Sequence, residues 1–156
     1  MKKQQEAFEK EVEVILDTNM LMTPSQISFD IFEAISDALL VPKITFSVMQ
    51  ATITELTTIA QARSKEAREA RVALHLIKQK NVIIIPPPKK MEKISYADIV
   101  IITYATEKSK TRPEMTILVA TNDRMLKKQL LEKNITVMSV AGKQRMIIRK
   151  PMEFSS

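Results

Sequence analysis

Short apolar runs alternate along this chain with longer segments of helical periodicity, and this alternation constrains the fold more than any other feature of the sequence. The runs "VIII" at 82–85 and "ILVA" at 117–120 contain no polar residue. Such uninterrupted runs are typical of strands in a parallel sheet, which helices bury on both faces. The pattern therefore predicts an α/β fold with a mostly parallel central sheet and helices on both faces.

The expected elements follow from periodicity and from helix-breaking residues. Buried strands are expected at 12–16, 43–46, 81–85, 115–123 and 135–140, and helices at 28–40, 48–80, 95–108 and 124–134. The second helix has an expected interruption near 63–65, and Ser47 with Gln50 suggests a capping box at its start. We expect one domain over 1–156, with 1–11 as a charged helix or arm and 143–156 as a basic C-terminal tail.

Composition excludes several kinds of site. The chain has no cysteine and a single histidine, His75, so disulfides, thiolate zinc sites and histidine-rich metal sites are excluded and any metal ligands must be oxygens. Its one glycine cannot form a Walker loop or a dinucleotide fingerprint, both of which need several glycines. Because no long apolar run or signal-peptide pattern occurs, we expect a soluble cytoplasmic protein without a membrane partner.

The net charge of +6 favours a polyanionic partner. The excess is concentrated near the C-terminus, where eight cations between 124 and 150 face one acid, Glu132. Such a segment suits contact with RNA phosphates, although solvated surface charge explains any single cation equally well. The candidate RNA-binding residues are Arg124, Lys127, Lys128, Lys143, Arg145, Arg149 and Lys150.

Four acids occupy positions that need an explanation. Asp17 and Asp123 follow apolar strands, and ligands bind outside the carboxyl ends of the strands in open parallel sheets. Glu55 and Asp98 have apolar helical neighbours, where an unpaired charge is costly. A divalent cation would satisfy all four carboxylates together, and oxygen ligands favour Mg²⁺ or Mn²⁺.

Each acid also has a structural explanation. Asp17 with Asn19 could form a turn, Asp98 could complete a capping box with Ser95, and Asp123 or Asn122 could cap the following helix. Glu55 has the weakest such explanation, a salt bridge to a nearby arginine. The order of all four acids along an α/β chain favours the metal site.

The motifs "VILDTNMLM", "ITEL", "YADIVIITYA" and "ILVATNDRMLKKQL" resemble those of the PIN-domain nucleases from about Val12 to Gly142. The resemblance implies a five-stranded, mostly parallel sheet, frequent dimers, and Asp17, Glu55, Asp98 and Asp123 as the catalytic and metal-binding quartet. It also implies supporting roles for Asn19, Thr121 and the adjacent Asn122. In PIN proteins linked to ribosomal RNA processing, a second acid often follows the third acid of the quartet. This chain has Ile99 at that position, which puts the number of bound metals in doubt.

The form "ATNDR" and the basic C-terminal end are similar to the archaeal and eukaryotic PIN proteins linked to ribosomal RNA processing. The resemblance implies a metal-dependent endoribonuclease that cleaves single-stranded RNA. Two alternatives stay open. One is an inactive RNA-binding factor in ribosome assembly, and the other is a VapC-type toxin whose partner is a small antitoxin.

Overall fold

The computed structural model describes residues 11–22, 30–87, 97–142 and 145–151. Within them, six strands form one sheet in the order β3-β2-β1-β4-β5-β6. The strands are β1 (Glu11–Leu16), β2 (Lys43–Met49), β3 (Ile83–Ile85), β4 (Thr116–Ala120), β5 (Thr136–Ala141) and β6 (Arg145–Arg149). All neighbouring pairs are parallel except β5 and β6. The predicted α/β class with a mostly parallel sheet is therefore confirmed.

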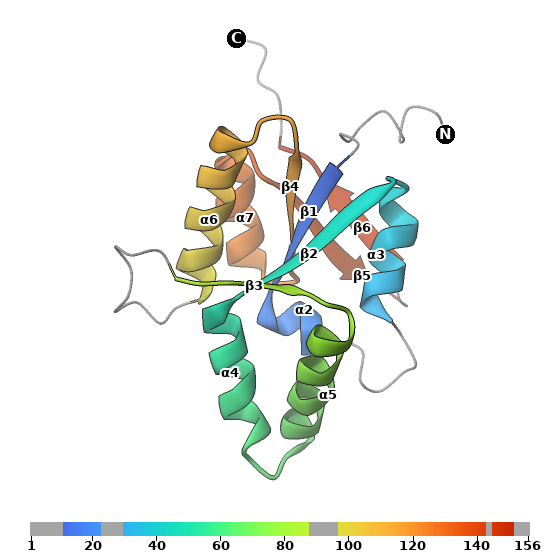
Figure 1. Cartoon of the computed structure of the whole chain (residues 1–156), viewed down its shortest axis with the longest axis vertical. Helices are drawn as coiled ribbons and strands as arrows, with labels where there is room; N and C mark the ends of the chain where they lie inside the picture. Colours follow the sequence, from blue (N-terminus) through green and yellow to red (C-terminus); the bar gives the residue numbers. More distant parts are fainter. Residues whose placement is uncertain (1–10, 23–29, 88–96, 143–144, 152–156) are drawn as a thin grey trace.

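Two helical layers cover the sheet (Figure 1). The helices are α2 (Thr18–Met22), α3 (Ile31–Leu39), α4 (Gln50–Ala60), α5 (Lys65–Gln79), α6 (Ala97–Thr111) and α7 (Arg124–Glu132). Residues of α2 to α5 pack with Val12, Val14 and Leu16 on one face of β1. Residues of α6 and α7 pack with Ile15 on the opposite face. Side chains alternate between the faces of a strand, so β1 contributes to both cores.

The chain changes direction across the sheet at β1. It first adds β2 and β3 on one side of β1, and then returns through α6 to add β4 and β5 on the other side. The register places Leu16 beside Ala120, so Asp17 and Thr121 leave the sheet next to each other. Ligands of open α/β sheets bind at this kind of switch point.

The predicted helices are present, with the expected break between α4 and α5. The capping box at Ser47 is wrong, because Ser47 lies inside β2 and its hydroxyl donates to Glu13 (2.7 Å), while Met49 precedes α4 without a side-chain cap. The strand at 83–85 is not buried, because β3 forms one edge of the sheet and Ile83 and Ile84 are about half exposed.

Two elements were not predicted. The short helix α2 follows Asp17 directly, and β6 replaces part of the expected basic tail. The five strands implied by the resemblance are present, with β6 as a sixth, antiparallel edge strand. The expected charged helix or arm at 1–11 lies outside the described residues except for Glu11, which is the first residue of β1. None of the described helices has the length and apolar character needed to cross a membrane.

Candidate functional site

Asp17 is held at the carboxyl end of β1 by hydrogen bonds to both of its carboxylate oxygens. Thr18 N donates to Oδ1 (2.8 Å), and Thr121 Oγ1 donates to Oδ2 (2.7 Å). The side chain is only 3% exposed. Burial nevertheless raises the pKa of Asp17, and the hydrogen bonds offset this effect only in part. A carboxylate that is oriented but incompletely stabilised can accept a further positive partner.

Thr121 links this carboxylate to a second acid. Its buried hydroxyl accepts from Asp123 N (3.1 Å) while it donates to Asp17. Asp123 also caps α7, because its Oδ1 accepts from Leu126 N (3.1 Å). The structural explanation of Asp123 is thus correct, but the cap uses only one of its two oxygens, and the negative charge of Asp123 still raises the pKa of Asp17.

The other two acids belong to the same electrostatic cluster. Glu55 lies in the second turn of α4, where burial and the charges of Asp17 and Asp98 raise its pKa. Asp98 lies in the first turn of α6, where partial desolvation and the charge of Asp123 raise its pKa. The structure therefore brings the four predicted acids within electrostatic range of one another, except that Glu55 and Asp123 do not affect each other directly. We call these four residues the acid cluster. Asp98 is more exposed than its apolar neighbours in the sequence suggested.

The acid cluster is not neutralised within the described parts of the chain, where no lysine or arginine forms an ion pair with any of its members. The buried Thr18 Oγ1 makes no hydrogen bond of ordinary geometry, although it lies near enough to Glu55 to lower the pKa of that acid slightly. Oxygen donors with uncompensated negative charge fit Mg²⁺ or Mn²⁺. As they stand, however, no three acidic or histidine side chains of the described residues are close enough to bind one ion together.

The supporting residues differ in their roles. Thr121 orients Asp17 directly, as described above. Asn122 accepts a hydrogen bond at Oδ1 from Val140 N (2.9 Å), which ties the end of β4 to β5. Asn19 is exposed in the first turn of α2.

A basic groove of about 610 Å³ begins at Arg124, the residue after Asp123, and follows α7 away from the acid cluster, with Glu132 and Asn134 also in its lining. Arg124, Lys127, Lys128 and Leu131 form one stripe of α7, because residues three, four and seven apart share a helix face. Arg149 and Lys150 line the same groove from the end of β6. The stripe begins at the residue after Asp123 and extends for about 10 Å along the helix.

Among the described residues, one predicted RNA-binding residue, Arg145, does not line this groove. Arg145 is exposed at the opposite end of β6 from Arg149, and Lys143 lies outside the described residues. Arg145 and Arg149 lie apart because β6 pairs with β5 as an extended strand, and the two arginines are its first and last residues.

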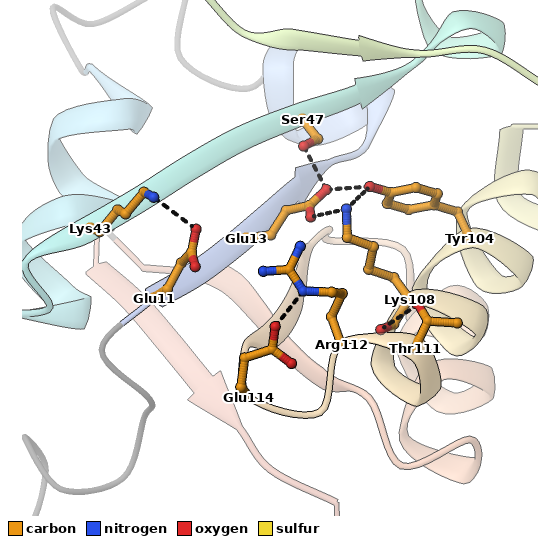
Figure 2. A network of polar contacts seen from close by, with 9 residues as sticks. All are labelled: Glu11, Glu13, Lys43, Ser47, Tyr104, Lys108, Thr111, Arg112 and Glu114. Carbon is orange, nitrogen blue, oxygen red and sulfur yellow. Dashed lines mark hydrogen bonds and ion pairs between the residues drawn. The ribbon is translucent and has the colours of Figure 1, made fainter.

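Sequence reasoning missed a second buried acid, Glu13, on the same face of β1 as Asp17. Its carboxylate accepts from Ser47 Oγ (2.7 Å) and Tyr104 OH (2.7 Å), and Lys108 Nζ lies 3.4 Å away (Figure 2). Burial and this carboxylate raise the pKa of Tyr104, which stays protonated and donates. We call Glu13, Ser47, Tyr104 and Lys108 the Glu13 network. It fixes α6, the helix that carries Asp98, against β1. A carboxylate between Val12 and Val14 was the available signal.

Most of the chain matches a known family of domains. A family model described as "PIN like domain" matches residues 14–143, a range that includes the whole acid cluster. No curated protein shows a significant match to the chain.

The raised pKa of Asp98 predicts how this residue affects stability. A folded-state pKa above the unfolded value of 3.8 means that the folded protein binds more protons between those two values, so the free energy of unfolding falls as pH rises through that range. Asp98→Asn should therefore raise the melting temperature at pH 7, only modestly because solvent screens this exposed group, and the gain should shrink as the pH falls toward 3.8. Thermal melts from pH 4 to 8 would test this, with Asp37→Asn on α3 as the control. A gain that does not depend on pH would contradict it.

The Glu13 network should behave as one unit. Glu13→Gln and Tyr104→Phe should each lower the free energy of unfolding by about 1–3 kcal/mol, because each leaves buried polar groups without their partners. The double variant should lose less than the sum of the two changes, since the groups interact directly. Urea unfolding of the four proteins would measure this coupling. Replacing the exposed pair Arg112 and Glu114 with alanines is the control and should change stability little.

Proposed function

Because the chain belongs to the PIN-like domain family, we propose that it is a divalent-metal-dependent endoribonuclease that cleaves single-stranded RNA. The observation that carries this proposal is the acid cluster, whose four carboxylates come from separate elements, lie within electrostatic range at the switch point of the sheet, and form no ion pair with a cation of the described residues. Repulsion between carboxylates does not stabilise a fold, but the same negative charges are what a metal ion requires of its ligands.

Asp17, Glu55, Asp98 and Asp123 would hold Mg²⁺ or Mn²⁺. The bound ion would polarise a phosphodiester and make hydroxide available near neutral pH. The protein's own contribution is orientation. Thr18 N and Thr121 Oγ1 hold the carboxylate of Asp17, and the start of α7 holds that of Asp123. Hydrogen-bonded supports of this kind keep metal ligands in a productive geometry.

The basic groove would bind the phosphates of RNA beside the cut. Contacts to phosphates give affinity without reading the sequence, so the groove alone would accept many RNAs. Aromatic residues make up only 4% of the chain, so base stacking would contribute little. We propose ribosomal RNA precursors as the substrate, supported by the "ATNDR" motif and the concentration of cations near it.

A second candidate is an RNA-binding assembly factor that does not cleave. One observation favours it, since no three acids of the described residues are close enough to hold a metal ion without rearrangement. Such a factor would bind through the basic groove and would leave RNA intact in every metal.

The first test is cleavage of a labelled single-stranded RNA in Mn²⁺, Mg²⁺ or EDTA. Wild type should cut only with metal, and Asp17→Asn should not cut at all. Thr121→Val, which removes one hydroxyl with little change in size, should reduce cleavage about 10–100-fold, because it frees the Asp17 carboxylate without deleting it. Mn²⁺ should also raise the melting temperature of wild type but not of Asp17→Asn. Binding without cutting in every metal would favour the assembly factor.

The basic groove should set the salt dependence of binding. Replacing Lys127, Lys128 and Arg149 with alanine should lower the slope of log K against log salt by about 0.7 for each phosphate that the protein no longer neutralises. The variants would be measured in the Asp17→Asn background, which prevents cleavage. Lys43→Ala with Lys110→Ala is the control, since both lysines are exposed and lie outside the groove. An unchanged slope in the groove variant would remove the groove from the binding surface.

A further inference from the structure

A second basic surface lies at the turn between α4 and α5. A cavity of about 540 Å³ at this turn is lined by Arg63, Lys65, Arg68 and Arg71, together with Ala62 and Ser64. All four cationic side chains are exposed. Nothing in the basic groove on α7 accounts for this surface, because the two share no residue.

Among the described residues, three of these four cations have no ion-pair partner. Arg71 Nη1 donates to Ala60 O (2.7 Å) and so closes the turn. Arg63, Lys65 and Arg68, by contrast, form no ion pair with the other described residues. We call these three residues the tip cluster.

The position of the tip cluster on α5 is electrostatically unfavourable for the protein alone. Lys65 is the first residue of α5 and Arg68 the fourth, and Glu66 is the only acid in the first turn. The N-terminus of a helix already carries partial positive charge, which repels cations. Ser64 caps the helix by accepting from Ala67 N (3.1 Å), so the cations are not needed for capping. A bound anion would instead be attracted both by these cations and by the positive end of the helix.

The tip cluster and the basic groove lie on different sides of the acid cluster. Figure 1 shows α4 and α5 projecting together beyond the carboxyl edge of the sheet, whereas α7 lies along the sheet. Glu55 lies five residues before the end of α4 at Ala60, about 7.5 Å along the helix, and Arg63 lies in the turn that follows. The basic groove begins at Arg124, beside Asp123. A strand that crosses the acid cluster could therefore meet cations both before and after the reacting phosphate.

We propose that the tip cluster is a second phosphate-binding site for the RNA strand, on the opposite side of the cut from the basic groove. This inference rests on the proposed function, because it assigns a role to the tip cluster in binding the same substrate. The ligand is the sugar–phosphate backbone, so the site adds affinity and fixes the path of the strand without reading bases. An RNA must extend past the cut by several nucleotides to reach it.

The test compares RNAs of two lengths. Binding of a long single-stranded RNA and of one truncated on the side of α4 and α5 would be measured against salt, in the Asp17→Asn background. Arg63→Ala with Arg68→Ala should lower the salt slope for the long RNA by about 1.4, which is 0.7 for each phosphate left without its arginine, and should leave the slope for the short RNA unchanged. Ser64 and Arg71 stay native, so the turn is preserved.

Two further variants define the outcome. Arg63→Lys with Arg68→Lys keeps the charge and should keep the slope of the parent protein. Lys43→Ala with Lys110→Ala removes the same charge elsewhere and should affect both RNAs equally. An unchanged slope for the long RNA, or an equal loss for both lengths, would overturn the role of the tip cluster. Failure of wild type to cleave RNA would instead overturn the nuclease proposal, since these binding measurements do not depend on cleavage.

Discussion

The parallel pairing of β1 with β4 is the constraint on which the rest of the structure depends. It joins the two halves of the sheet, which α2 to α5 cover on one face and α6 and α7 cover on the other. It also aligns the ends of the two strands, so that Thr121 can donate to Asp17 while it accepts from Asp123. The register of the two strands and the hydroxyl of Thr121 together set the spacing of Asp17 and Asp123. Shifting this register by one residue would turn the side chains of a whole strand toward the other core.

The two buried acids of β1 show how the same residue type can serve the fold or a site. Glu13 and Asp17 lie four residues apart on one face of the strand and are equally buried. Glu13 has two hydroxyl donors and a lysine, so its charge is compensated and it holds α6 in place. Asp17 has two hydrogen bonds but faces other carboxylates. An incompletely compensated carboxylate such as Asp17 costs stability, and a binding site is a place where a fold tolerates that cost.

The order of strands and helices could be predicted from the sequence because periodicity and burial are local properties. The acids after β1 and β4 could be predicted for a related reason, since parallel strands end at a common edge. Features that depend on distant partners could not be predicted. Ser47 has the sequence signature of a helix cap, but its hydroxyl instead donates a hydrogen bond to Glu13, 34 positions earlier in the chain. The cations near the C-terminus form a charged run in the sequence, yet the pairing of β6 divides them between the groove and the far end of the strand.

The long separation between the acids has a consequence for the newly made protein. The hydrogen bond between Thr121 and Asp17 spans 104 positions, and Glu55 and Asp98 come from two further elements between them. No fragment that ends before β4 contains all four carboxylates, and loop closure over such a distance comes late in folding. A chain segment that ends before Asp123 therefore lacks part of the acid cluster. The four carboxylates come into proximity only after β1 has paired with β4, so the acid cluster is a product of the tertiary structure and not of any single segment.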